Sequence, residues 1–200
     1  MIMTHMNRKY FHKMFGADGP IVMPVIHALD KEQVYKNVSI AMDQNVAGIF
    51  LINHDFGIQK FLPIIKYIRA KFDRLWIGIN FLAVTGRDAF PILEKLNQEN
   101  ILINGYWADD ACIDEQNTEQ IEAEKIAQVR ENTTWSGIYF GGTAFKKQRP
   151  VKPQEYKLSA EIATRYMDVV TTSGPATGIE AGVKKIETFR DGVGNNALAL

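Results

Sequence analysis

The sequence predicts an α/β fold of the (β/α)8 TIM-barrel type, in which parallel strands alternate with helices. Two observations support this prediction. Short, β-rich apolar segments recur along the chain, and their starts lie roughly 27 to 31 residues apart, the size of one βα unit. Their apolar residues are continuous, as expected of strands covered on both faces. A doubly wound open sheet is the alternative, but the even spacing and the absence of a GxGxxG motif after any strand favour the barrel.

Seven segments carry the strand pattern, and each has four to six residues. This is close to the usual strand length. In chain order they are Ile21–Ile26, Gly48–Ile52, Leu75–Ile79, Gly105–Ala108, Ser136–Phe140, Met167–Thr171 and Ala197–Leu200.

Amphipathic segments of helical period separate these strands, and the sequence predicts six helices. The clearest pattern is formed by Ile58, Phe61, Leu62, Ile65 and Ile68, whose spacing places them on one helix face. Asn117, followed three residues later by Gln120, predicts a capping box at the start of the fourth helix. The other apolar faces are Val34, Val38, Ala41, Met42 and Asn45 in the first helix, Phe90, Leu93 and Leu96 in the third, and Gly182, Val183, Ile186 and Phe189 in the sixth.

Composition excludes several classes of protein. The 23 basic residues balance the 23 acidic ones, so the chain lacks the positive charge typical of a nucleic-acid binder. The single cysteine, Cys112, excludes an internal disulfide framework and fits a reducing cytosol. No apolar run approaches the ~20 residues of a membrane-spanning helix, and residues 1–14 lack the apolar region of a secretory signal. We therefore predict a cytoplasmic protein with no transmembrane segment.

Length leads to a further expectation. We find no linker, so residues 1–200 are predicted to be one domain with a lead-in over 1–18. That domain corresponds to about six and a half βα units of an architecture that needs eight and typically runs to about 250 residues. We therefore expect a barrel truncated at its C-terminal end. Its unpaired strand edges would favour association, for example as a homo-oligomer.

Candidate catalytic residues follow the strands, where the βα loops of a parallel barrel carry the chemistry. His27 follows the first strand, His54 the second and Asp109 the fourth. Histidine titrates near neutrality and can transfer protons or bind a metal, although it can equally well bond a backbone carbonyl. Asp109 and its neighbour Asp110 could form a carboxylate pair or bind a divalent cation, or could belong to an ordinary loop. Because no HxH or HExxH spacing is present, we assign no metal ligands.

Two asparagines are candidate ligand-binding residues. Asn53 ends the second strand and Asn80 the third. Successive side chains of a strand point in opposite directions, so only one or two of Asn53, His54 and Asp55 are expected to face the mouth of the barrel.

The turn Ser173–Gly178, SGPATG, is the strongest local motif. Its glycines allow a tight turn, its hydroxyls can donate, and a following helix would add free N–H groups and a partial positive charge. We predict that Ser173, Gly174, Thr177 and Gly178 bind an anion such as phosphate. The alternative is a turn that only caps the helix.

A long basic loop, Gly142–Pro153, follows the fifth strand and contains Lys146, Lys147, Arg149 and Lys152. It exceeds the usual βα loop of roughly 2–6 residues. It is expected to be a lid or a clamp for an anionic substrate, with Lys146 orienting the ligand, or a solvated surface loop. Cys112 has no histidine nearby in sequence and is interpreted as a packing residue.

Three segments resemble the BtpA family of TIM-barrel proteins. Trp76–Leu82 resembles the family's Gly-Val-Asn-hydrophobic-Leu strand, Ser173–Gly178 is similar to its Thr-Gly turn after strand six, and His27 matches its strand-one histidine. The chain departs from the family after the first strand, where Ala28-Leu-Asp30 replaces a Leu-Pro-Gly-rich stretch, and at Asn104–Trp107, where the family has Arg-x-Asn. The resemblance implies a TIM barrel and, from the family's name-giving member, a link to photosystem I biogenesis.

These observations lead to three hypotheses. The first is a BtpA-like enzyme that binds a small phosphorylated or nucleoside-like ligand at the C-terminal face of the barrel. The second is a non-catalytic assembly or regulatory factor for a membrane complex. The third is a metal-dependent hydrolase that uses the His/Asp rim. The sequence indicates no particular cofactor.

Overall fold

The computed structural model describes residues 6–200, and the predicted fold class is confirmed. The described residues form one sheet of seven parallel strands in the sequential order β1 to β7, so each strand lies beside the next along the chain. The strands are β1 (Val25–Ala28), β2 (Ile49–Asn53), β3 (Ile77–Phe81), β4 (Gly105–Ala108), β5 (Ile138–Gly142), β6 (Val169–Thr171) and β7 (Ala197–Ala199). This order is that of a βα barrel rather than of a doubly wound sheet.

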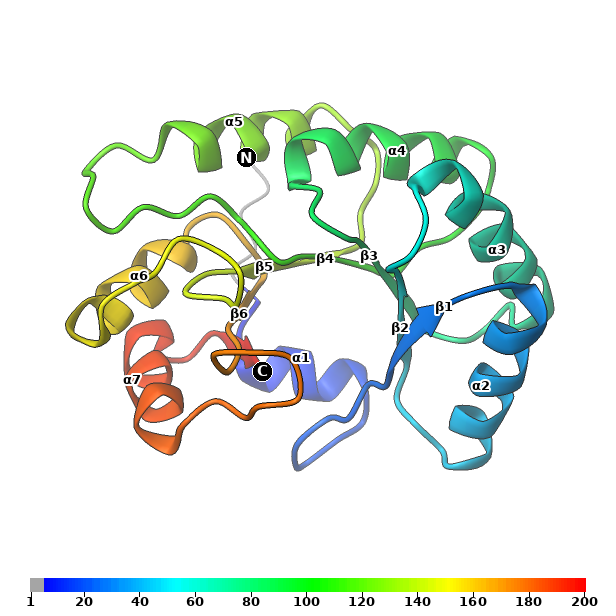
Figure 1. Ribbon diagram of the computed structural model, residues 1–200, viewed down its shortest axis with the longest axis horizontal. Coiled ribbons are helices and arrows are strands. Elements are labelled where there is room, and N and C mark those ends of the chain that lie inside the picture. Colours follow the sequence, from blue (N-terminus) through cyan, green and yellow to red (C-terminus); the bar gives the residue numbers. More distant parts are fainter. Residues whose placement is uncertain (1–5) are drawn as a thin grey trace.

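Helices cover the convex side of the curved sheet, as Figure 1 shows. They are α2 (Lys31–Asp43), α3 (Ile58–Lys71), α4 (Gly86–Gln98), α5 (Ile121–Glu131), α6 (Tyr156–Ala163) and α7 (Val183–Val193). A short 3-10 helix, η1 (Pro153–Glu155), leads directly into α6. No helix in the described part of the chain is long and apolar enough to cross a bilayer.

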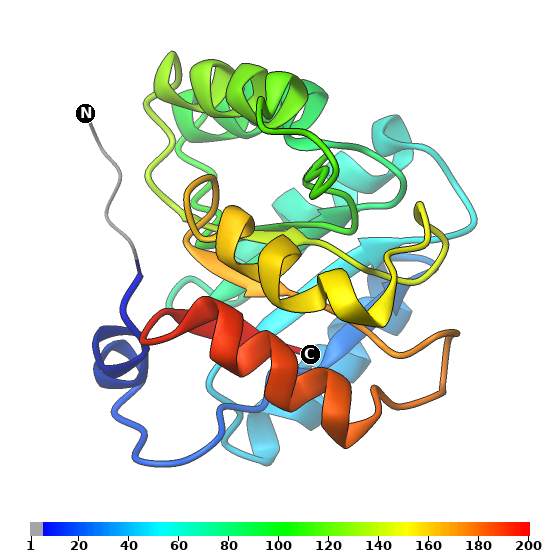
Figure 2. The same ribbon diagram turned by 90° about the vertical axis from the view of Figure 1, so that its left-hand side faces the viewer.

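The sheet does not close between its first and last strands. Among the described residues, β1 pairs with β2 and β7 pairs with β6, but β1 and β7 do not pair with each other. The additional helix α1 (Arg8–Met14) lies at this opening (Figures 1 and 2). Among the described strands, β1 therefore has the expected unpaired edge, whereas the outer edge of β7 is partly paired with the N-terminal segment.

The N-terminal segment is joined to β7. The N–H of Ala197 donates to the carbonyl of Met6 at 2.9 Å, and the N–H of Arg8 donates to the carbonyl of Asn195 at 2.8 Å. Asn7 and Asn196 form an antiparallel bridge between these two bonds. Residues predicted to be a lead-in thus contain a helix and a strand-like contact.

Two element boundaries differ from the predicted ones. β1 begins at Val25 instead of Ile21, because Pro20 and Pro24 lack the N–H that a strand ladder uses. α5 begins at Ile121, after the predicted capping box. The side chain of Gln120 donates backwards to the carbonyls of Asp114 and Asn117, both at 2.7 Å, which stabilises the preceding turn instead of a helix that starts there.

The apolar core is divided by the sheet. The large cluster lies between the sheet and its helices and contains strand residues such as Leu51, Ile79 and Tyr139. The smaller cluster lies on the inner face and contains Phe50, Phe140, Trp76 and Trp107. Because successive strand residues alternate between the faces, this division shows which strand-end side chains point into the barrel.

Candidate functional site

Four of the predicted site residues lie on the inner face at the C-terminal edge of the sheet. Asp109 lies two residues after Trp107, and His54 lies four residues after Phe50, so each shares the inner face with that aromatic residue. Asn80 pairs in register with Ile52, whose other register partner is His27. The C-terminal rim of the barrel therefore carries two histidines, an amide and a carboxylate from four adjacent strands.

Asn80 and Asp109 form the most buried polar pair of this rim. Asn80 is completely buried, and its Nδ2 donates to Oδ1 of Asp109 at 2.9 Å. Its Oδ1 has no hydrogen-bond partner among the described residues. Burial raises the pKa of Asp109, and the hydrogen bond from Asn80 and the charges of Lys146 and Lys147 oppose that rise only in part.

The two histidines lie side by side at the ends of β1 and β2. Their ring centroids are 5.5 Å apart, and both side chains are exposed. Nδ1 of His54 is 3.2 Å from Oδ1 of Asp55, which is also exposed. This pair can reach solvent, whereas Asp109 is half-buried.

Asn53 lies on the other face of the sheet and is bonded locally. Its Nδ2 donates to the carbonyl of Phe56 at 2.7 Å, and its Oδ1 accepts the N–H of Leu82 at 3.1 Å. These bonds link the loops after β2 and β3. Asn53 can thus shape the rim without facing it.

The loop between β5 and η1 brings Lys146 to the rim. The backbone N–H of Lys146 donates to Oγ of Ser173 at 2.8 Å, which joins this loop to the loop after β6. Farther along, Arg149 forms a two-point ion pair with the buried carboxylate of Glu115, at 2.8 and 2.7 Å. The loop is thus attached to its neighbours at two points.

The turn Ser173–Gly178 differs from its predicted setting. α7 begins at Val183 with Gly182 as its N-cap, so four residues separate the turn from the helix. The free N–H groups of α7 are therefore displaced from the turn. Oγ of Ser173 also donates to the carbonyl of Gly174 at 2.9 Å, and Thr177 and Gly178 lie on the exposed part of the loop. The predicted phosphate cradle is not supported.

Lys185 is a residue of the rim that the sequence did not single out. Its Nζ donates to the carbonyls of Ala144 at 2.6 Å and Ser173 at 2.7 Å, so one ammonium joins α7 to the loops after β5 and β6. Burial lowers the pKa of Lys185. Lys185 lies two residues after the first residue of α7, and the sequence gave no signal for its role because its partners are backbone carbonyls.

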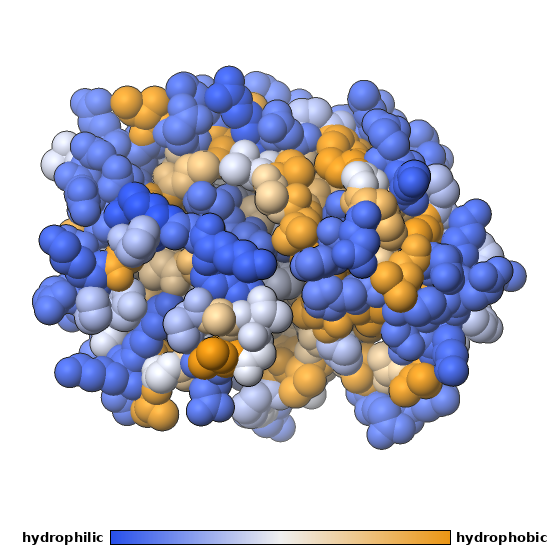
Figure 3. Space-filling model, in the orientation of Figure 1, coloured by the Kyte–Doolittle hydropathy of each residue, from blue (hydrophilic) through white to orange (hydrophobic). Residues whose placement is uncertain are grey.

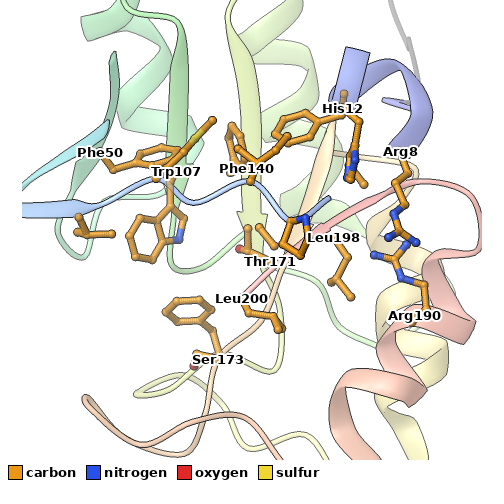
Figure 4. A pocket seen from close by; sticks show the side chains of 18 of the residues that line it. Arg8, His12, Phe50, Trp107, Phe140, Thr171, Ser173, Arg190, Leu198 and Leu200 are labelled. Carbon is orange, nitrogen blue, oxygen red and sulfur yellow. The ribbon is translucent and has the colours of Figure 1, made fainter. Parts of the chain in front are cut away.

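A cavity of about 520 Å³ opens on the inner face below this rim. Its walls come from β2, β4, β5, β6, β7 and the N-terminal segment (Figure 4). In the space-filling view, hydrophilic residues cover most of the surface and apolar residues show through toward the centre (Figure 3). Trp107 and Thr171 line the cavity, each with a buried polar atom that has no hydrogen-bond partner in the described residues.

Comparisons with known proteins bear on the fold alone. No family model and no curated protein matches the sequence. The solved structures that it resembles include the 3,6-anhydro-D-galactonate cycloisomerase from Zobellia galactanivorans, with a TM-score of 0.58 and 18% identity over 93% of this chain and 48% of that one. An enolase from Bradyrhizobium, complexed with magnesium and mandelic acid, has a TM-score of 0.56 and 14% identity over 88% and 44% of the two chains.

A member of the enolase superfamily of unknown function from Enterococcus faecalis is similar at a TM-score of 0.55 and 14% identity, over 93% of this chain and 44% of that one. The chain thus spans less than half the length of these structures.

The BtpA resemblance is therefore corrected. The similar structures belong to the enolase and mandelate racemase superfamily, and no sequence family matches. The three segments behind the resemblance are strand ends and a glycine turn, features that parallel barrels share for structural reasons. The predicted BtpA-like function and the alternative of an assembly factor both depended on this resemblance, and both are corrected with it.

The described residues do not form a magnesium site. Two of the similar structures hold magnesium, but in residues 6–200 no three His, Cys, Asp or Glu side chains gather to hold a metal ion. Asp109 accepts a hydrogen bond from Asn80, and the charges of Lys146 and Lys147 act on its carboxyl group. The predicted metal-dependent hydrolase is also corrected, because the similar structures are named as an epimerase, a cycloisomerase and members of the enolase superfamily, and none of these is named as a hydrolase.

Proposed function

We propose that the C-terminal rim of this barrel is an active site for proton transfer on a small carboxylic acid. Asp109 is the acid–base group, and Asn80 holds it. His27 and His54 provide a second proton carrier at the adjacent strand ends, and Lys146 orients the anionic end of the substrate. The observation that carries this proposal is the half-buried carboxyl of Asp109, bonded to a fully buried amide at the end of a parallel strand.

The chemistry follows from the environment of Asp109. A general base is most effective when its pKa lies near the working pH, and burial moves the pKa of this carboxyl in that direction. The hydrogen bond from Asn80 fixes one carboxylate oxygen, which leaves the other free to accept a proton from carbon. The exposed histidine pair, at the ends of β1 and β2, is accessible to solvent and can exchange protons with water.

The comparisons support the class of reaction. One similar structure is a cycloisomerase of a sugar acid, others are dipeptide epimerases, and another holds mandelic acid. Proton removal beside a carboxylate would be a step common to such reactions. Because these likenesses are at 18% identity or less, the substrate of this chain has to be found by experiment.

Exchange of a carbon-bound proton provides the test. The protein is incubated in D2O with a panel of 2-hydroxy acids, sugar acids and dipeptides, and loss of the α-proton signal is followed by NMR. We expect exchange with at least one acid. Asp109→Asn should slow that exchange by at least about 100-fold, the usual contribution of a general base.

The matched control is Asp110→Asn, because Asp110 is the exposed neighbour of Asp109 and should tolerate the change with exchange intact. The proposal is wrong if no acid in the panel exchanges, or if the Asp109 and Asp110 variants exchange at the same rate.

A further inference from the structure

The cavity on the inner face has a mostly apolar lining. It extends from Lys146 and Ser173 at the rim to Arg8 and Phe11 of α1. Phe50 and Phe140 form a wall of edge-to-face rings, with centroids 5.2 Å apart. Ile21 and Met23, which precede β1, and Val25 of β1 also line the cavity. An apolar chain would be desolvated along this path.

The rim end of the cavity contains two buried donors that the protein leaves unpaired. Nε1 of Trp107 and Oγ1 of Thr171 have no partner among the described residues, and Thr171 is only 5% exposed. Figure 4 shows the indole nitrogen of Trp107 turned toward the interior, on the side of Thr171. A buried polar group without a hydrogen-bond partner is unfavourable, so an acceptor inside the cavity would stabilise both groups.

A positive charge lies at the same end. Lys146 lines the cavity and forms no ion pair among the described residues, and its ammonium is 5.8 Å from the ring centroid of Phe145. Two neutral donors and one ammonium lining the same cavity match a carboxylate, which accepts several hydrogen bonds and carries one negative charge.

The cations at the opposite end are differently placed. Arg190 already donates to the carbonyl of Asn196 at 2.9 Å and to that of Gly194, and Arg8 is exposed to solvent. These guanidiniums do not leave a buried group unpaired. The polar end of a ligand is therefore expected at Trp107 and Thr171, whose buried donors lack partners among the described residues.

We propose that this cavity binds a medium-chain fatty acid. Its carboxylate would accept from Trp107 and Thr171 and face Lys146, and its alkyl chain would run between Phe50 and Phe140 toward α1. The proposal goes beyond the proton-transfer function and does not rest on it, because binding is measured without any reaction.

Isothermal titration calorimetry of the whole chain with decanoate tests the proposal, with decan-1-ol as the uncharged probe of equal length. Decanoate should bind at least about tenfold more tightly than the alcohol, because only the acid carries a charge for Lys146. Thr171→Val preserves the shape and removes the hydroxyl. It should weaken decanoate binding about three- to tenfold.

Lys146→Met should weaken decanoate binding by about tenfold or more and leave decan-1-ol unaffected. Lys147→Met is the matched control, because Lys147 is the exposed neighbour and does not line the cavity, so its decanoate affinity should stay within about twofold. Circular dichroism confirms that each variant is folded. Thr171→Val is expected to fold, since it replaces an unpaired buried hydroxyl by a methyl group.

Three results would overturn the proposal. The first is no binding of decanoate to the wild type. The second is equal affinity for decanoate and decan-1-ol. The third is a loss of decanoate affinity in Arg8→Met together with an unchanged affinity in Thr171→Val, which would place the carboxylate at the α1 end. Failure of the proton-exchange assay would leave these binding results unaffected.

Discussion

At the scale of single residues, the direction of a side chain decides its chemistry. Asp109 and Asp110 are identical in the sequence, yet Asp110 is exposed and accepts the N–H of Cys112 at 2.7 Å. Asp109 is half-buried beside Asn80. The two-residue period of a strand is sufficient to separate the candidate acid–base group from an ordinary turn residue.

The pH dependence of stability should reveal this difference. Since burial raises the pKa of Asp109 above that of the unfolded chain, the unfolded state loses its proton first. Below the unfolded pKa the neutral carboxyl favours the fold in full, and this contribution is lost as the pH rises through the folded pKa. Asp109→Asn should therefore become more stable relative to wild type when the pH rises from about 4 to about 7.

Urea unfolding of both proteins at each pH measures this relative stability, with Asp110→Asn as the comparison. If Asp109→Asn instead became less stable relative to wild type as the pH rises, the fold would favour the charged form of Asp109.

At the scale of elements, one arginine joins the end of α3 to two strands. Arg69 is 6% exposed, and its guanidinium donates to the carbonyls of Phe72, Asp73, Leu75 and Leu102. It also donates at 2.9 Å to Oδ1 of Asn104, which accepts the N–H of Ile77. The side chain of Arg69 thus holds the segments that lead into β3 and β4.

Arg69→Met should destabilise the protein by about 3–5 kcal/mol, because it leaves several buried carbonyls without a donor. The measurement is the midpoint of urea denaturation at constant m-value. Arg74→Met is the control, because Arg74 is exposed, and its effect should stay within about 0.5 kcal/mol. Equal effects of the two variants would show that the hydrogen bonds of Arg69 do not hold these strand entries.

The elements were predictable where their pattern is local. The faces of α3 and α4 follow from the spacing of residues such as Ile65 and Leu93, both of which are buried. The predicted start of β1 was four residues too early, because the apolar run Ile21–Ile26 contains Pro24, which has no N–H to donate to a ladder. The role of Arg69 was invisible, because its partners are carbonyls more than thirty positions away as well as nearby ones.

For the candidate site, the sequence predicted which residues lie at the strand ends but not which of them are in contact. Alternation and position indicated His27, His54, Asn80 and Asp109, and the structure places them on one rim. The pairing of Asn80 with Asp109 depends on the register between β3 and β4, which no local pattern reports. Thr171 and Trp107 were expected as strand residues. Only the structure shows that both line a cavity and that their buried polar atoms have no partner among the described residues.

At the scale of the whole molecule, the two faces of the sheet are packed differently. Phe90 is completely buried in the large cluster, in contact with Tyr106, Trp135 and Tyr139. Phe140 is also buried, but it borders the cavity. The helix-covered face thus has close packing, whereas the inner face retains space.

This difference predicts unequal costs for the same substitution. Phe90→Ala should destabilise the protein by about 3–5 kcal/mol, because the closely packed surroundings cannot fill the void. Phe140→Ala should cost roughly half as much, because part of its surface already faces a cavity and has no contacts to lose. Thermal unfolding by calorimetry measures both. Equal losses would show that the inner face is packed as closely as the outer one.

The bond between Met6 and Ala197 has a consequence for how the molecule is made. During synthesis Met6 leaves the ribosome before all seven strands of the sheet, whereas its partner Ala197 lies in the last of those strands. Sequence-distant contacts of this kind slow folding, because the chain closes a long loop before the contact is rewarded. The βα units can therefore assemble one after another as they are synthesised, whereas α1 can dock only after β7 has been synthesised. The contact between the N-terminal segment and β7 therefore forms after these units.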